Sequence, residues 1–404
     1  MTLSPTPTKP SSGTCRACLA SDCRHLHRQY FVLPGVEGKL SYDIQTCNRC
    51  GFIFADNIPA TEALEAHYQE AEHHLHPDIP PGLSTIHRDF FDFIQQHADL
   101  PKEASILDIG CGMGHFLSLF KAAGHGDVLG LEPSRSAQRQ AAERYGIEIV
   151  PETLGSFSPP RAFELITMCG VFEHIPDIPA ALARITDIGN RDALLFLAVP
   201  DAASFGTTPS TEPFLEFALE HINFFTPATL RNLLERHGFS ALTIESRANS
   251  FYNNSYIYGL FRAGLKERPG LTHDATGEES IRAYIECSNG NLAAIRARLD
   301  DLATRQTPTI IWGAGALATR LCATTPVDRL RLLGFVDKNR QLQGKSMFGA
   351  HIQPPEWLHE QDRDATVVVF STTYGAEIAR DLQEQFSWRG SILRIDLDET
   401  TTSA

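Results

Sequence analysis

The stretch "ILDIGCGMGHFL", residues 106 to 117, decides the fold of this chain. A short apolar run typical of a buried strand leads into Gly110, Gly112 and Gly114, and a helical pattern follows. Glycines at these positions allow a ligand to approach the backbone closely at the N-terminus of the helix. The pattern predicts a Rossmann-like α/β fold, although the phosphate-binding turns of dinucleotide enzymes have similar glycines.

Acidic residues around this turn narrow the choice of ligand. Asp108 lies just before the glycines, and Glu132 ends the next predicted strand in "LGLEPS". A carboxylate at the end of that second strand can accept hydrogen bonds from both hydroxyls of a ribose. The acid before the glycines suits a cationic amino-acid group better than a pyrophosphate, because unlike charges attract. The two acids therefore favour a nucleoside cofactor that carries an amino-acid part.

Apolar strands alternate with amphipathic helices from about residue 104 to 262, which predicts a parallel α/β sheet. The predicted strands of this sheet are "SILDIG", "DVLGLEP", "GIEIVP", "FELITMCG", "ALLFLAVP", "FSALTIES" and "SYIYGLF". Helices are expected ahead of it in "TEALEAHY" and "IHRDFFDFIQQHA".

The alternation begins again after a polar linker and a predicted helix at about 279 to 304. The strands expected in this last part are "TIIWGAG", "RLLGFVD", "ATVVVFST" and "SILRID". They predict a second, smaller doubly wound unit. We therefore expect three domains, at residues 1–70, 71–262 and 263–404.

Composition and charge limit the class of partner. The formal net charge of −14 argues against a protein that coats nucleic-acid phosphates. The longest apolar run, "ALLFLAV", is far too short to span a membrane, and the N-terminus lacks the apolar region of a secretory signal. We expect a cytoplasmic protein, a monomer or weak homodimer, that acts on a small molecule and binds neither nucleic acid nor membrane.

Four of the nine cysteines form two C-x-x-C pairs, Cys15 with Cys18 in "CRAC" and Cys47 with Cys50 in "CNRC". The odd total and this pairing argue against a disulfide framework. Two such pairs can build a closed tetrahedral zinc site of the structural type. The pairs therefore predict structural zinc, with His25 or His27 as alternative ligands and a metal-free or redox dithiol pair as the other interpretation.

The block around the glycine turn resembles the class I S-adenosylmethionine-dependent methyltransferases, whose first motif has the same acid followed by spaced glycines. The resemblance implies S-adenosylmethionine as cofactor, with Glu132 on its ribose. The other cofactor-binding residues that it implies are Asp108, Gly110, Cys111, Gly112 and Gly114 on the methionine side, Thr153 near the adenine, and Cys169, Gly170 and Val171 of "CGVFEHI", where the family closes over the cofactor.

The order of modules along the whole chain is similar to that of the zinc-binding deoxysugar C-methyltransferases of antibiotic biosynthesis. The residues that carry this resemblance are "CRAC", "CNRCGFIFAD", "GLEPS", "EHINFFT", "GAGALATR" and "GFVDKN". It implies C-methylation of a nucleotide-linked keto-deoxysugar. Methylation of an oxygen, on a sugar or another small natural-product intermediate, is the alternative.

Two Glu-His pairs compete for a catalytic role. Glu173-His174 follows the fourth strand, where many class I methyltransferases use such a pair to shape the cofactor pocket. Glu220-His221 lies in an insertion after the fifth strand, beyond the strand ends where ligands bind in this fold. We predict that His221 removes a proton from carbon and that Glu220 orients it. A histidine buried for packing is the alternative, and Tyr68, His73, His74 and His76 are further candidates.

A second glycine motif in "TIIWGAGALATR" resembles a dinucleotide fingerprint, with Gly313, Gly315 and Ala318 and with Asp337 ending the next strand. Taken alone it would predict NAD(P) binding. In the resembled family this domain is Rossmann-like without being a dehydrogenase, so we favour a structural or substrate-nucleotide-binding role. A scaffold protein with a vestigial cofactor fold and a zinc-ribbon RNA methyltransferase are the remaining alternatives for the whole chain.

Overall fold

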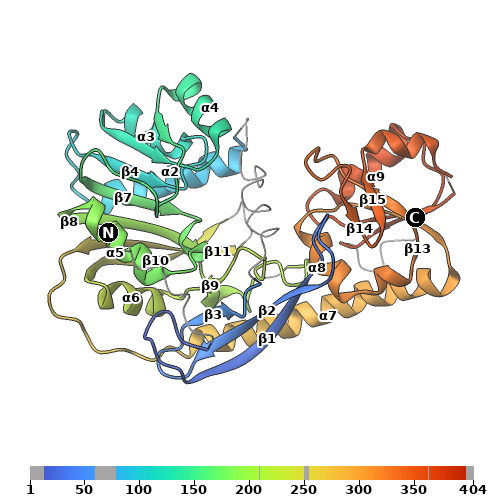
Figure 1. Ribbon diagram of the computed structural model, residues 1–404, viewed down its shortest axis with the longest axis horizontal. Coiled ribbons are helices and arrows are strands. Elements are labelled where there is room, and N and C mark those ends of the chain that lie inside the picture. The colour runs from blue at the N-terminus through green and yellow to red at the C-terminus, as the bar shows by residue number, and fades with distance from the viewer. Residues whose placement is uncertain (1–12, 60–78, 209, 250–253, 363, 397–404) are drawn as a thin grey trace, which may run out of the picture.

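The computed structural model describes residues 13–59, 79–208, 210–249, 254–362 and 364–396, which form three β-sheets and the helices around them (Figure 1). The seven-stranded sheet and the six-stranded sheet lie at opposite ends of the molecule. The four-stranded sheet runs between them beside the long helix α7 (Thr276–Arg305). The helix predicted in "TEALEAHY" lies outside the described residues.

The seven-stranded sheet has the order β10-β11-β8-β7-β4-β5-β6, and its first five strands in the chain are parallel as predicted. The strand bounds are β4 (Ile106–Ile109), β5 (Val128–Leu131), β6 (Glu148–Val150), β7 (Phe163–Cys169), β8 (Gly189–Pro200), β10 (Phe239–Asn249) and β11 (Asn254–Ala263). The order reverses between β4 and β7. Ligands bind beyond the carboxyl ends of the strands at such a switch point.

The prediction of a wholly parallel sheet was wrong for its last two strands. β10 pairs antiparallel with β11, and β11 pairs antiparallel with β8. The physical reason is the length of the connection, because Asn249 and Asn254 are opposite partners and only four residues separate them. Parallel neighbours need a crossover of a dozen residues or more, so a connection this short requires a hairpin.

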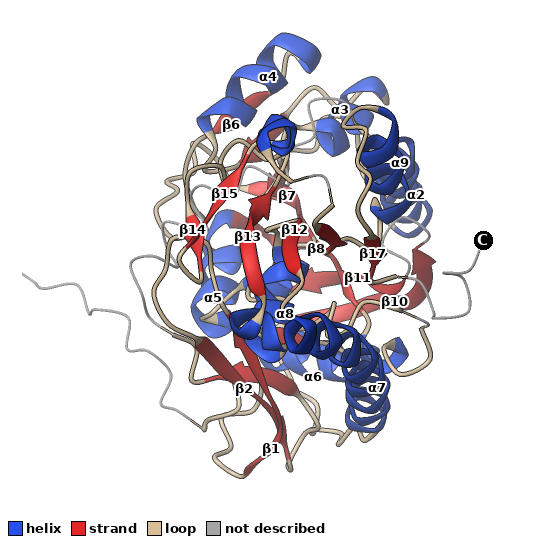
Figure 2. Ribbon diagram, turned by 90° about the vertical axis from the view of Figure 1, so that its right-hand side faces the viewer, coloured by secondary structure: helices blue, strands red, loops and turns tan. Residues whose placement is uncertain are grey.

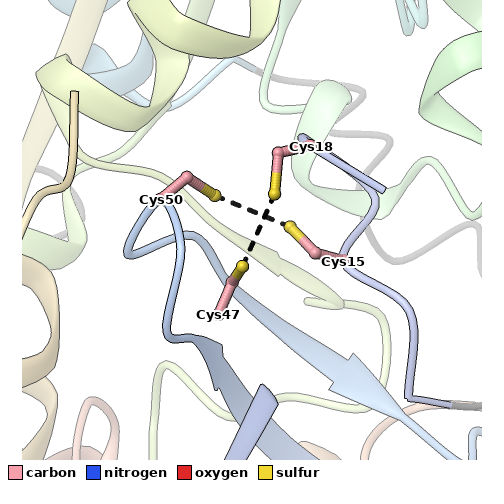
Figure 3. A group of neighbouring side chains, drawn as sticks. All are labelled: Cys15, Cys18, Cys47 and Cys50. Atoms are coloured by element: carbon pink, nitrogen blue, oxygen red, sulfur yellow. Dashed lines mark hydrogen bonds between the residues drawn. The ribbon is translucent and has the colours of Figure 1, made fainter. Parts of the chain in front are cut away.

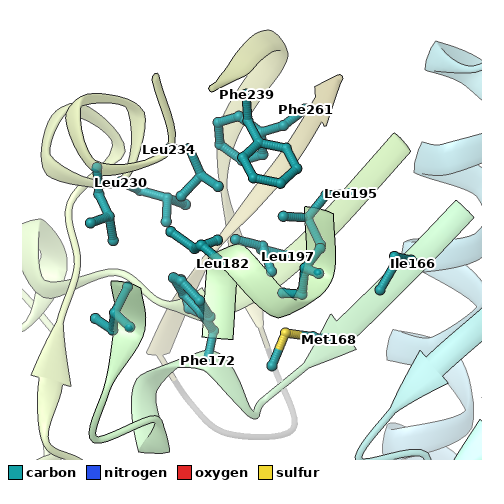
Figure 4. Packing of buried hydrophobic residues seen from close by; sticks show 14 of the residues in the cluster. Ile166, Met168, Phe172, Leu182, Leu195, Leu197, Leu230, Leu234, Phe239 and Phe261 are labelled. Carbon is teal, nitrogen blue, oxygen red and sulfur yellow. The ribbon is translucent and has the colours of Figure 1, made fainter. Parts of the chain in front are cut away.

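Helices cover both faces of this sheet. On one face lie α2 (Pro81–His97), α3 (His115–Ala122) and α4 (Arg135–Tyr145), and on the other lie α5 (Ile178–Ile188) and α6 (Pro227–Arg236). Alternate residues of each strand face opposite layers, so Leu165 packs with the first group while Ile166 and Met168 pack with the second. Figure 4 shows Leu182 of α5 and Leu230 of α6 in this second layer.

The cysteine-bearing part forms a four-stranded antiparallel sheet of β1 (Cys23–Phe31), β2 (Leu40–Cys47), β3 (Ile53–Asp56) and β9 (Asn223–Phe224). Its strands were not predicted from the sequence. The first of them, β1, is mostly polar, and only Gln29 and Phe31 are buried in it. β9 comes from the insertion that follows β8, and it pairs with β3. The insertion with the second Glu-His pair is therefore joined to the N-terminal sheet.

The C-terminal sheet is the predicted second doubly wound unit, with the order β14-β15-β13-β12-β16-β17 (Figure 2). Its elements are β12 (Pro308–Trp312), α8 (Ala316–Thr324), β13 (Arg331–Val336), β14 (Ser346–Met347), β15 (Ala350–Gln353), β16 (Thr366–Val369), α9 (Gly375–Glu384) and β17 (Ile392–Arg394). None of the helices in the described ranges has the length and apolarity needed to cross a membrane.

Backbone and side-chain contacts fasten this unit to the rest of the chain. The N–H of Val32, just after β1, donates to the carbonyl of Thr319 in α8 at 2.9 Å. Arg320 of α8 forms a buried ion pair with Glu212 of the insertion, and Thr372 donates to the same carboxylate at 2.8 Å. The C-terminal unit therefore contacts the insertion directly.

Arg320→Met should lower the melting temperature strongly, because it leaves the Glu212 carboxylate at this interface without its cation. Removing one partner of a buried pair costs about 3–5 kcal/mol. Differential scanning calorimetry would measure the loss, and the double variant Arg320→Met/Glu212→Gln should regain most of it. The matched control is Arg329→Met, since Arg329 and its partner Asp300 are both exposed and such pairs contribute about 0–1 kcal/mol. Equal effects of Arg320→Met and Arg329→Met would contradict the account.

Candidate functional site

The glycine turn after β4 lies against the loop after β7. Gly110, Gly112 and Gly114 all have positive φ angles, at 72°, 50° and 76°. Residues other than glycine rarely adopt such angles. A Cβ on Gly110 would lie 2.4 Å from Cγ2 of Val171. The turn therefore requires glycine both for its conformation and for the close approach of the two loops. Gly114 is the N-cap of α3, so the helix follows the glycines as predicted.

Two acids flank this turn, the buried Asp108 and the half-buried Glu132. Asp108 of β4 accepts a hydrogen bond at 2.6 Å from the Thr167 hydroxyl of β7, and burial raises the pKa of Asp108 to about 7. Glu132, just after β5, accepts from the N–H of Gly112 at 3.3 Å and from that of Ser134 at 3.2 Å. Each carboxylate oxygen keeps further lone pairs that can accept from a ligand.

The two Glu-His pairs do not form two sites. Glu173 and His174 lie on a short 3₁₀ helix, Phe172–His174, after β7, and His221 reaches them from the insertion. Ligating atoms of Glu173, His174 and His221 all lie within 4.8 Å of one another. The two imidazole rings stack with their centroids 5.2 Å apart. Glu220 is half-buried and is not a member of this group.

Burial controls the chemistry of the acid in this group. Glu173 is only 2% exposed, and its Oε2 has no hydrogen-bond partner among the described residues. Burial raises the pKa of Glu173 to about 7, while His221 opposes the shift and the carboxylate of Glu216 adds to it. Nδ1 of His221 lies 3.3 Å from the carbonyl oxygen of Glu216. A proton on Nδ1 can be donated to that carbonyl, which leaves Nε2 of His221 as the basic nitrogen.

The four predicted cysteines come together in one buried cluster (Figure 3). The Sγ atoms of Cys15 and Cys50 lie 3.7 Å apart and those of Cys18 and Cys47 lie 3.5 Å apart. A tetrahedral zinc ion with Zn–S bonds of about 2.3 Å requires sulfurs about 3.8 Å apart. The spacing and the soft thiol donors fit that ion, whereas His25 bonds with Asp43 and His27 lies against Gln29.

The two C-x-x-C turns have the same backbone bonds. Leu19 N–H donates to the carbonyl of Cys15 and Gly51 N–H to that of Cys47, at 2.9 and 2.8 Å. Leu19 and Gly51 both have positive φ. Only Gly51 is crowded, because a Cβ there would lie 1.8 Å from the carbonyl oxygen of Asp274, just before α7. The second turn is therefore packed tightly against the start of that helix.

Comparison with known proteins agrees with this geometry. A model of the methyltransferase domain matches residues 83–244, from α2 to β10. The C-methyltransferase NovU of Streptomyces niveus is 23% identical over 345 residues, which cover 81% of this chain and 78% of NovU. That alignment is more than twice as long as the matched domain, so it includes parts outside it.

The chain is an S-adenosylmethionine-dependent methyltransferase. Its seven-stranded sheet has the class I Rossmann-like fold. Two further similarities are less extensive. A ubiquinone biosynthesis O-methyltransferase of Neisseria meningitidis is 29% identical over 148 residues, which cover 34% of this chain and 58% of that enzyme. A crystal structure of a Burkholderia thailandensis 1,6-didemethyltoxoflavin-N1-methyltransferase with S-adenosylhomocysteine has 18% identity and a TM-score of 0.42, and covers 58% of this chain and all of that one.

The methyltransferase brings most of the residues singled out in its sequence to the carboxyl ends of β4, β5 and β7. Cys111 packs beside Gly130 of β5, where a Cβ would lie 2.5 Å from its Sγ. Gly170 lies in the loop after β7, and a Cβ on it would lie 3.9 Å from Oε1 of Glu173. The loop whose Val171 packs against Gly110 therefore also leads into the Glu-His group. Thr153 lies after β6 and contacts Ser156. The candidates Tyr68, His73, His74 and His76 lie outside the described residues.

Sequence reasoning missed several residues of this methyltransferase that hold the site together. Thr167 fixes Asp108, and Gly130 makes room for Cys111. Asn223 donates to the carbonyls of Glu173 and Ile175 at 3.2 and 2.8 Å. Buried polar residues in strands are the available signal for Thr167 and Asn223, because such residues need partners.

Proposed function

We propose that this methyltransferase transfers a methyl group to carbon in a nucleotide-linked keto-deoxysugar, with His221 as the general base. The observation that carries the proposal is the convergence of His221 with Glu173 and His174 beside the glycine turn. The similarity to NovU, which is named a C-methyltransferase, supports methylation of carbon over methylation of oxygen.

The residues around the turn fit S-adenosylmethionine. Asp108 is a buried acid suited to a cationic amino-acid group, and Glu132 has lone pairs left for two ribose hydroxyls. The positive-φ glycines leave the backbone bare where a ligand would lie against it. Cys169, Gly170 and Val171 at the end of β7 would form the opposite wall of the cofactor site, and Thr153, which follows β6, would lie near the adenine.

Zinc is the ion that we propose for the four-cysteine cluster. The four thiols lie close enough to share one ion, and their soft donors suit zinc. Four cysteine ligands leave no open position, so the ion would have a structural role and take no part in methyl transfer.

The side chains of the Glu-His group can perform the proton transfer that carbon methylation needs. Nε2 of His221 would take a proton from the carbon next to the ketone, and the electrons of that C–H bond would form an enolate. Glu173, ionised beside the new imidazolium, would stabilise it. S-adenosylmethionine supplies the sulfonium methyl group that the enolate carbon attacks, with the S–C bond electrons left on sulfur.

Deuterium exchange tests this role without requiring methyl transfer. The enzyme, a panel of nucleotide-linked keto-deoxysugars and S-adenosylhomocysteine would be incubated in D₂O, and mass spectrometry would detect a gain of one mass unit. We expect exchange next to the ketone of the true acceptor, and none with His221→Ala. A substrate that accepts a methyl group on oxygen, with no exchange at carbon, would instead establish the O-methyltransferase alternative.

Asp108→Asn should raise the stability of the cofactor-free protein and weaken its binding of the cofactor. The pKa of Asp108 rises from 3.8 to about 7. A carboxyl with a raised folded-state pKa destabilises the fold above that pKa, and the penalty fades as the pH falls toward the ordinary value. The penalty is on the order of 4 kcal/mol. The cofactor-free variant should therefore melt above wild type at pH 8, and the difference should be smaller at pH 5.

Cofactor binding should respond in the opposite direction, because the neutral amide of the Asp108→Asn variant would offer no charge to the amino group. A charge-assisted hydrogen bond contributes about 1.5–3 kcal/mol, so titration calorimetry should show the Kd for S-adenosylmethionine rising at least tenfold. An unchanged Kd would remove Asp108 from the cofactor site.

A further inference from the structure

An arginine lies inside the first cysteine turn, between Cys15 and Cys18. Arg16 is 8% exposed, and its guanidinium packs over the ring of Phe54. It donates hydrogen bonds to the carbonyl of Ala55 at 2.7 Å, to the carbonyl of Ile222 at 3.3 Å, and to Oδ1 of Asn223 at 3.0 Å. Arg16 therefore joins the cysteine cluster to the two residues that directly follow His221.

The same two residues hold the backbone of Glu173. Ile222 N–H donates to the carbonyl of Glu173 at 3.1 Å, and Asn223 Nδ2 donates to that carbonyl at 3.2 Å and to the carbonyl of Ile175 at 2.8 Å. A continuous series of hydrogen bonds thus leads from the cysteine turn through Arg16 and Asn223 to Glu173. These bonds determine where the His221 backbone lies relative to the Glu173 backbone.

Stability alone does not account for an arginine at this position. The three hydrogen-bond acceptors of its guanidinium are uncharged oxygens. Asp56 and Asp177 attract it electrostatically, but burial is the larger effect and lowers the pKa of Arg16. Burying a charged group costs free energy, and a well-packed apolar side chain of similar length often stabilises a fold as much or more. The directional bonds of a planar guanidinium can, however, fix three backbone segments relative to one another.

We propose that Arg16 is a positioning residue that couples the cysteine cluster to the His221–Glu173 pair. Whether the cluster holds its zinc ion would then control turnover. The coupling rests on the proposed function in that it treats His221 as the base. The cluster would then align the catalytic residues in addition to stabilising the N-terminal sheet.

Arg16→Met tests the coupling, because methionine fills much of the same space and donates no hydrogen bonds. The variant should keep its zinc content and its Kd for S-adenosylmethionine, while kcat falls at least tenfold and KM for the acceptor changes less than threefold. Arg24→Met is the matched control from β1, the strand that follows the cysteine turn, since Arg24 is half exposed and pairs with Glu278 at the surface. Its kcat should stay within twofold of wild type.

A second readout needs no substrate. In protein labelled with ¹³Cε1-histidine, the His221 resonance is the one that His221→Gln removes. At one fixed pH it should move in Arg16→Met and after zinc is removed with a chelator, but stay unchanged in Arg24→Met. A moved resonance in an enzyme that methylates none of the keto-sugars would contradict the proposed function and leave the coupling intact. An unmoved resonance would overturn the coupling.

Asn223→Asp covers the case in which Arg16→Met fails to fold. This isosteric variant keeps an acceptor for Arg16 and removes the donor to Glu173 and Ile175. It should lower kcat and move the His221 resonance as Arg16→Met does. Wild-type kcat and an unmoved resonance in Asn223→Asp would also overturn the coupling.

Discussion

His221→Ala should lower kcat by about 10²–10⁴-fold, the usual contribution of a general base, while S-adenosylmethionine binds as in wild type. The imidazole is the group whose Nε2 remains basic when Nδ1 donates to the carbonyl of Glu216. Its removal leaves the acidic C–H of the acceptor without a proton acceptor. The cofactor-binding turn lies on other elements, so titration calorimetry should return an unchanged Kd.

Variants of the neighbouring residues distinguish the base from its surroundings. Glu173→Gln should lower kcat less than His221→Ala, because the base remains but loses the carboxylate that stabilises its protonated form. His273→Ala, at an exposed histidine, should leave kcat unchanged. If His174→Ala loses activity and His221→Ala keeps it, the assignment of the base is reversed.

Cys47→Ser should remove the bound zinc and lower the melting temperature by many degrees. Structural zinc supplies about 10–16 kcal/mol of apparent binding free energy in small peptides, and this cluster lies where β2, the insertion and the start of α7 meet. Elemental analysis should find one zinc ion per wild-type chain and none in the variant. Calorimetry would measure the loss of stability.

Cys23→Ser is the matched control for the cluster. Cys23 begins β1 beside the four cysteines but is not a member of their group, and its Sγ lies 3.8 Å from the carbonyl of Ala20. This variant should keep one zinc ion and nearly the wild-type melting temperature. A wild-type protein that melts at the same temperature with and without a strong chelator would contradict the structural role of zinc.

Much of the fold could be predicted because its strands are buried and apolar. "SILDIG", "FELITMCG" and "ALLFLAVP" became β4, β7 and β8, and the repeat of this pattern predicted the C-terminal sheet. The amphipathic helix expected in "IHRDFFDFIQQHA" is found in α2. The domain boundaries near residues 70 and 262 stay predictions.

The rest depended on contacts between segments far apart in the chain. β1 is stabilised by its pairing with β2 and not by its own apolar residues, so it has no strong pattern. β9 has only two residues and exists because β3 lies beside it. Nothing local indicates that Glu173 and His221, 48 positions apart, share one site.

The assignment of catalytic residues shows the same limit. Glu220 was predicted as the partner of His221 because the two are neighbours in sequence. In the structure, His221 converges with Glu173 and His174. The role of each acid remains a prediction, and Glu220→Gln beside Glu173→Gln would compare them directly.

The position of the transferred methyl group tests the central claim most directly. The enzyme would be incubated with S-adenosylmethionine labelled with ¹³C in its methyl group and with the panel of nucleotide-linked keto-deoxysugars, and carbon NMR would locate the label. The account predicts a ¹³C methyl bonded to the carbon next to the ketone, at a shift typical of C–CH₃. A label at the shift of O–CH₃ would contradict carbon methylation, and a protein that binds the cofactor but labels no sugar would contradict the proposed acceptor.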